Sequence, residues 1–227
     1  MRLATLLFCS LLAASPAPPA AEATTAPEVR GLLARLDEAR PALGGGCLRV
    51  PFERRKATPL LRRPLASSGV LTASGGALRW ETLEPRPGET VIAGGEMRIV
   101  YPEQRRVEVY PLGGAAAAAG FGPASPLSGL PDRFAVTRAD PPAWEGDRAP
   151  GLTGLRLVPL DADTAAQLRS IRLGVEEATG SVRRLETVES DGSSTVYRFG
   201  RAEVSEDPCP IEPPAPEGYE VVRPLGE

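Results

Sequence analysis

Histidine is absent from this chain of 227 residues. Hydrolases that use an imidazole base are therefore excluded, and so are metal sites with histidine ligands. No glycine-rich phosphate loop of the Walker or dinucleotide type is present. Aromatic residues make up only 5% of the chain, which leaves few rings for the sugar platforms of carboxylate-only glycosidases. We therefore expect no catalytic residues, no metal site and no cofactor.

Positive charge is not in excess. The chain holds 26 Lys and Arg against 29 Asp and Glu, a net charge of -3. Binding of nucleic acid requires a concentrated basic face, so we expect no nucleic-acid partner. Long apolar runs are also missing after the first residues, and none approaches the roughly 20 residues that cross a bilayer.

The first 23 residues have the pattern of a secretory signal peptide. Arg2 precedes an apolar stretch at 3–14, and Ala21 and Ala23 form a small-x-small cleavage pattern. We expect cleavage near Ala23, export to the periplasm, and a single mature domain over 24–227. An uncleaved anchor is the alternative.

Two cysteines, Cys47 and Cys209, remain after the signal peptide. They lie near the two ends of the mature chain, and exported proteins fold in an oxidising compartment. A disulfide between them is our prediction, and two free thiols are the alternative. Such a bridge would close a loop of roughly 160 residues and stabilise the fold by about 5 kcal/mol in the chain-entropy model.

One amphipathic helix of about 14 residues opens the mature chain. Thr25, with Glu28 three positions later, resembles a capping box. Pro41 and the glycines at 44–46 end the helix. Its apolar residues recur at helical spacing: Val29, Leu32, Leu33, Leu36 and Ala39.

Short alternating segments separated by turn residues follow the helix, and they predict an antiparallel meander. Gly94-Gly95 and Asp191-Gly192 are hairpin turn signals. Residues 115–119 are consecutive alanines between glycines, and 161–170 predict a polar turn or short helix. The predicted strands lie at 48–52, 68–73, 78–82, 90–93, 97–101, 107–109, 134–136, 155–157, 171–175, 181–189 and 194–204.

A sheet of about 10–11 strands curls or closes rather than staying flat. Its inner face must be filled by side chains, by helices or by a ligand. The predicted helices are too small to fill it, so the pattern indicates a mainly β protein of the α+β class with an internal cavity.

The chain resembles the periplasmic outer-membrane lipoprotein carriers, the LolA-like family. The similar stretches are SGVL at 68–71 with LRW at 78–80, VIAGG at 91–95 with MRIVYP at 97–102, LRLVP at 155–159, and Pro213-Pro214 with Gly218 and Val221. One departure concerns the Arg-Pro pair that the family carries before the aromatic strand. Residues 74–76 here read Ser-Gly-Gly, so the arginine that holds the family's lid shut is missing.

This resemblance implies a half-open antiparallel β-barrel with a helical lid or plug over an apolar concavity. It implies a monomeric carrier that shelters lipoprotein acyl chains, or a related envelope lipid, between an inner-membrane donor complex and an outer-membrane acceptor. The segment at 115–119 is a candidate for the movable lid.

Alternation along the strands then predicts which side chains line the acyl cavity. The residues expected to face inward are Leu78, Trp80, Met97, Ile99, Tyr101, Val107, Val109, Phe134, Leu155, Leu157, Leu173 and Val175.

Two other functions remain open at this point. A periplasmic module that senses lipids or lipoproteins, without a transport role, could use the same curved sheet. A hydrolase that uses only carboxylates could recruit Glu81, Glu84 and Glu108, although charged residues that alternate on strands usually form a solvated face.

Overall fold

The computed structural model describes residues 25–40, 45–111, 123–144, 151–211 and 217–224. Within them, thirteen strands form one open sheet, and α1 (Pro27–Glu38) and α2 (Ala162–Gln167) are the α-helices. The predicted fold class, a mainly β half-open barrel with helices, is confirmed. The strand number exceeds the predicted 10–11, because two short C-terminal strands join the sheet.

The sheet consists of two antiparallel meanders joined through β1 and β11, in the order β13-β6-β5-β4-β3-β2-β1-β11-β10-β9-β8-β7. The first meander comprises β1 (Cys47–Ala57), β2 (Leu65–Ser74), β3 (Ala77–Glu84), β4 (Gly88–Ala93), β5 (Glu96–Tyr101) and β6 (Arg106–Pro111). The second comprises β7 (Phe134–Arg138), β8 (Leu152–Pro159), β9 (Leu168–Glu176), β10 (Ser181–Glu189) and β11 (Ser194–Phe199). Short 3-10 turns lie at η1 (Pro102–Gln104) and η3 (Leu130–Asp132).

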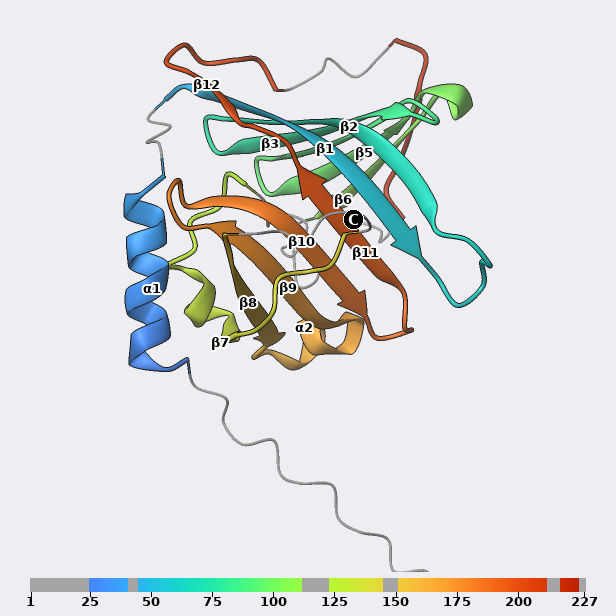
Figure 1. The fold of residues 1–227 in the computed structure, drawn as a ribbon. Helices are drawn as coiled ribbons and strands as arrows, with labels where there is room; N and C mark the ends of the chain where they lie inside the picture. Colours follow the sequence, from blue (N-terminus) through green and yellow to red (C-terminus); the bar gives the residue numbers. More distant parts are fainter. Residues whose placement is uncertain (1–24, 41–44, 112–122, 145–150, 212–216, 225–227) are drawn as a thin grey trace, which may run out of the picture.

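The turns occur where glycine permits a positive φ. Gly94 and Gly95 connect β4 to β5 with φ of 58° and 81°, and Gly192 lies between β10 and β11 with φ of 86°. Both predicted hairpins are therefore confirmed. The strands within both meanders pair in antiparallel register, and the curled sheet that they form has one concave and one convex face (Figure 1).

Helix α1 stands beside β7 and the neighbouring strands (Figure 1). Its apolar stripe is buried together with inward side chains of the second meander and with Leu127 and Leu130. Full burial of a leucine contributes about 1.5–3 kcal/mol, so this contact anchors the helix. The buried stripe consists of Val29, Leu32, Leu33 and Leu36.

The predicted capping box at Thr25 is wrong. The helix begins after Ala26 without a side-chain cap, and Pro27 occupies its first turn. The Thr25 hydroxyl instead accepts a hydrogen bond of 2.9 Å from the amide of Val136 in β7. Thr25 therefore provides an acceptor for an amide on the edge strand, since a buried amide without a partner is costly. The start of the helix needs a side-chain cap less, because Pro27 has no N–H to satisfy.

The C-terminal segment joins distant parts of the sheet. β12 (Glu203–Ser205) pairs with the start of β1, and the predicted Cys47–Cys209 disulfide is present, with Cα atoms 5.4 Å apart. β13 (Glu220–Val222) then lies parallel to β6 at the opposite edge. Tyr219 packs against a small cluster of buried valines on β5 and β6.

Some predictions concern residues outside the described ranges. They include the signal peptide with its cleavage near Ala23, and the alanine segment at 115–119. Of the helices in the described ranges, none combines the length and the apolar character that crossing a membrane requires.

Candidate functional site

The register of the first meander places five of the predicted inward residues on the concave face. Leu78 lies opposite Ile92 on β4, and Trp80 lies opposite Thr90. On the other side of β4, Met97 faces Ile92 and Ile99 faces Thr90. Directly opposed residues in an antiparallel pair share a face. Tyr101, two positions beyond Ile99, shares it too.

The inward orientation predicted for Val107 and Val109 is wrong. Ile99 lies opposite Glu108 and Val100 lies opposite Val107, so both valines point to the convex face. They are nonetheless buried, because Tyr219 packs over them there. Alternation showed that the two valines share a face. The register of β6 against β5 makes that face the convex one, and the distant C-terminal segment covers it.

The second meander also contributes inward side chains, but these are already packed. The predicted residues share the core with the stripe of α1 and are almost completely inaccessible to solvent. They therefore form the core that α1 covers. These residues are Phe134, Leu155, Leu157, Leu173 and Val175.

An unfilled hollow of about 430 Å³ lies on the concave face where the two meanders meet. Pockets for small ligands usually measure roughly 300–1,000 Å³. One part of its wall is apolar and aromatic: Phe52, Trp80, Ile92, Leu168, Leu185 and Tyr197. The other part is polar and contains Arg54, Lys56, Gln167, Glu189 and threonines of β3, β4, β10 and β11.

Rings from three strands form the aromatic floor of this hollow. The centroid of Trp80 on β3 lies 5.3 Å from that of Phe52 on β1 and 5.2 Å from that of Tyr197 on β11. The rings of Tyr197 and Phe199 are parallel, with centroids 5.9 Å apart. Such pairs stabilise by about 0.5–1.5 kcal/mol beyond their burial, so the floor is preformed.

Positive side chains occupy the polar part. Residues Phe52, Arg54 and Lys56 alternate along β1, so all three point into the hollow. The Lys56 ammonium lies 3.4 Å from the Glu189 carboxylate. Burial raises the pKa of Tyr197 above its usual value, and the nearby Arg54 guanidinium opposes that shift. Tyr197 therefore stays a neutral phenol at neutral pH.

Of the residues that line this hollow, Trp80 alone is among those predicted from the sequence to face inward. Phe52 was assigned to a strand without a role, and Arg54, Lys56 and Tyr197 were not singled out. The alternation Phe-x-Arg-x-Lys at 52–56 was the available signal. It became informative only once β1 was known to lie between β2 and β11, at the centre of the sheet.

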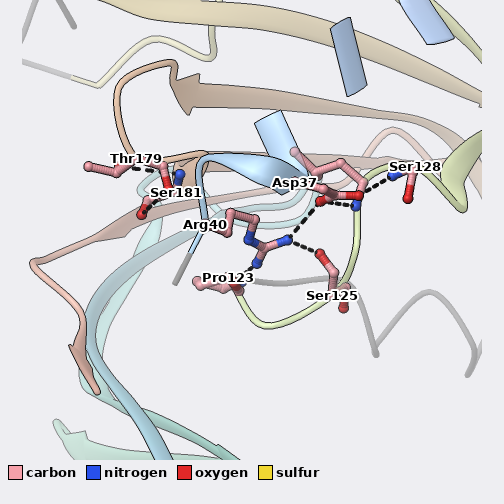
Figure 2. Close-up of polar contacts among 8 residues, drawn as sticks. Asp37, Arg40, Pro123, Ser125, Ser128, Thr179 and Ser181 are labelled. Carbon is pink, nitrogen blue, oxygen red and sulfur yellow. Dashed lines mark hydrogen bonds and ion pairs between the residues drawn. The ribbon is translucent and has the colours of Figure 1, made fainter. Parts of the chain in front are cut away.

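A second hollow of about 640 Å³ lies at the end of α1, beside the segment 123–128. Asp37 accepts hydrogen bonds from the amides of Leu127 (2.8 Å) and Ser128 (2.7 Å). Arg40 pairs with Asp37 at 3.5 Å and donates to the carbonyl groups of Pro123 and Ser125 (Figure 2). α1 is thus attached to segment 123–128 by a polar clamp that consists of Asp37 and Arg40.

Burial by itself would raise the pKa of Asp37. The amides of Leu127 and Ser128 and the charge of Arg40 outweigh it, so the pKa of Asp37 lies below its usual value. Burial lowers the pKa of Arg40, and the Asp37 carboxylate opposes that change. Both groups are charged at neutral pH, which keeps the clamp intact.

The candidate carboxylates for hydrolysis do not converge. Glu81 lies opposite Glu89 on the convex face, whereas Glu108 lies opposite Ile99 on the concave face. Glu108 is occupied by hydrogen bonds from the hydroxyl groups of Tyr101 (3.2 Å) and Tyr110 (2.9 Å). In the described ranges, no three His, Cys, Asp or Glu side chains are grouped so as to hold a metal ion.

No model of a known protein family matches the chain. The outer-membrane lipoprotein carrier protein of Dechloromonas aromatica (strain RCB) is 32% identical over 146 residues, which are 63% of this chain and 64% of that protein. This match supports the predicted resemblance to the LolA-like family. The match spans less than two thirds of the relative's length.

Solved structures similar to this chain have low sequence identity. An uncharacterised conserved protein from Thermus thermophilus matches with a TM-score of 0.52 and 10% identity, over 86% of this chain and 99% of that one. This similarity concerns the fold alone. A LolA superfamily protein from Nitrosomonas europaea matches at a TM-score of 0.41 and 12% identity, over 79% of this chain and 94% of that one, too low a score to support an argument.

Proposed function

We propose that this LolA-like chain binds acyl chains in the hollow on its concave face and carries them between membranes, without covalent chemistry. The aromatic hollow between the meanders is the observation on which the proposal rests. The name of the Dechloromonas relative, a lipoprotein carrier, supports it. The proposed location is the periplasm, with an inner-membrane donor and an outer-membrane acceptor.

The energetics of the hollow suit a carrier that must also release its cargo. Each buried methylene contributes roughly 0.8 kcal/mol, so an acyl chain of about 15 carbons offers on the order of 12 kcal/mol if fully sheltered. Threonines and charged side chains form part of the wall, and the hollow is open at one side. The chain is thus sheltered only in part, which lowers affinity and permits transfer.

The two tryptophans offer a direct test of binding. Trp80 lines the hollow, whereas Trp144 lies on the opposite face of the sheet, with the guanidinium carbons of Arg55 and Arg198 4.8 Å and 5.2 Å from its ring centroid. The variant W144F keeps only Trp80, and W80F keeps only Trp144. A lipid with a brominated acyl chain should quench fluorescence in W144F and leave W80F almost unchanged.

Absence of quenching in both variants, each folded by circular dichroism, would contradict binding in the hollow. Transport is tested separately, by loading the protein with a fluorescent lipid and measuring its transfer to acceptor vesicles. Binding without transfer to vesicles would favour the alternative function, a module that senses envelope lipids or lipoproteins.

A further inference from the structure

The hollow is divided into an apolar and a positively charged part along a single strand. Phe52, Arg54 and Lys56 project from β1 in this order, so the wall changes from aromatic at Phe52 to positively charged at Arg54 and Lys56. Of the 26 basic residues of the chain, Lys56 is the one lysine. A purely apolar cargo would make no favourable electrostatic contact with this charged part of the wall.

The two cations differ in how they are engaged. Arg54 donates its Nε proton to the Ser67 hydroxyl at 2.9 Å and interacts with the phenol of Tyr197. Both of these partners are neutral, and within the described part of the chain no carboxylate forms an ion pair with Arg54. A guanidinium has five N–H donors, so it can accept an anion without losing these bonds.

Lys56 is held only loosely. Its ammonium lies 3.4 Å from Glu189, and the two side chains are 39% and 37% exposed. Ion pairs of this kind contribute little to stability, so an incoming anion can compete for the ammonium at low cost. The polar wall carries two cations and one carboxylate, Arg54 and Lys56 against Glu189, which gives it a net positive charge.

The hollow has room for an acyl tail. Its volume of about 430 Å³ lies within the roughly 300–1,000 Å³ that is usual for pockets of small ligands. The apolar part of its wall, which includes Phe52, Trp80 and Leu185, provides the surface on which such a tail would lie.

We propose that the hollow takes an amphiphile with an anionic head, in which an acyl tail lies on Phe52, Trp80 and Leu185 and a carboxylate or phosphate head meets Arg54 and Lys56. The inference rests on the proposed function, because it specifies the cargo of the same hollow. It separates this chain from a carrier that binds acyl chains under an uncharged head.

The test compares two ligands that share a tail and differ in the charge of the head. Dibromostearate and its methyl ester are titrated into the W144F protein, and quenching of Trp80 reports the dissociation constants. We expect the anion to bind at least about tenfold more tightly than the ester. Added salt should weaken binding of the anion and leave binding of the ester unchanged. Equal affinities for the two ligands would overturn the proposal.

Variants locate the head group. R54Q and K56Q, each in the W144F background, should weaken binding of the anion about tenfold and leave binding of the ester unchanged, and R54K should retain part of the affinity. R49Q is the matched control, because Arg49 lies on the same strand and points to the opposite, exposed face. If R54Q and K56Q both behaved like R49Q, the assignment of the head group would be wrong.

A further ligand completes the experiment. A brominated lysophosphatidic acid, compared with dibromostearate, distinguishes phosphate from carboxylate as the preferred head. Failure of every ligand, the ester included, would instead contradict the proposed function itself.

Discussion

Gly180, in the turn between β9 and β10, lies directly against the carbonyl oxygen of Leu36 in α1. A Cβ added to Gly180 would come within 1.9 Å of that oxygen, and the φ of this glycine is +60°. The last turn of α1 therefore contacts the sheet through a position that tolerates no side chain. The glycine thus permits the end of α1 to lie directly against the turn between β9 and β10.

Replacement of Gly180 by alanine should loosen α1. The variant G180A adds both a steric conflict with backbone and an unfavourable φ, so we expect a loss of about 2–3 kcal/mol in the free energy of unfolding. G95A is the matched control, because Gly95 also has a positive φ of +81° but faces open space. It should cost only about 1 kcal/mol. Urea unfolding of both proteins measures the difference, and equal costs would argue against the close contact.

Removal of the Asp37 carboxylate should weaken the attachment of segment 123–128. In D37N the amides of Leu127 and Ser128 lose a charged acceptor, and Arg40 loses its ion pair. Because the side chain of Asp37 is partly exposed, we expect a loss of about 1–2 kcal/mol at pH 7. Faster hydrogen exchange at 127 and 128 should accompany it. Unchanged exchange there would show that the clamp does not hold the segment.

The polar clamp of Asp37 and Arg40 also predicts how the free energy of unfolding changes at acid pH. The pKa of Asp37 in the folded state lies below 3.8, so its stabilising effect is complete above pH 3.8 and is lost as the pH falls through the folded pKa. The difference in unfolding free energy between the wild-type protein and D37N should therefore shrink below pH 3.8. A difference that stayed constant from pH 7 to pH 2.5 would contradict the assigned shift.

The effect of Glu89 on stability should depend on pH in the opposite way to that of Asp37. Burial raises its pKa above 4.5, although Arg79 lies 2.5 Å away and counteracts the shift. A raised carboxylate pKa lowers stability at pH 7, and this penalty fades as the pH falls through the folded pKa. We expect E89Q to be as stable as wild type at pH 7, or more stable by up to about 1 kcal/mol. The two proteins should converge below pH 4.5, and a large loss in E89Q at pH 7 would refute this.

The disulfide should contribute strongly to stability because of the distance that it spans along the chain. Cys47 and Cys209 are 162 residues apart, so the bridge restricts the unfolded chain over most of its length. We expect the double variant C47A/C209A to lose about 2–4 kcal/mol. A reducing agent should destabilise the wild-type protein and leave the double variant unchanged. Sensitivity of both proteins to reductant would implicate a different bond.

The local features of this protein could be predicted from the sequence. Period-2 alternation is a property of neighbouring residues, so strands such as β3 and β5 were located without knowledge of their partners. Gly94-Gly95 and Asp191-Gly192 marked their turns for the same reason, since glycine alone accepts the positive φ there without cost. The pairing of Cys47 with Cys209 followed from the small number of candidates.

Which face each residue occupies, and what covers it, was decided only by tertiary structure. Val107 and Val109 alternate as well as Met97 and Ile99 do, yet they point to the convex face, where Tyr219 of the C-terminal segment covers them. The hollow exists because β1 pairs with β11, which brings Arg54 beside Tyr197 from more than 140 residues away. Such contacts depend on chain closure over long distances, and a local pattern of alternation carries no information about them.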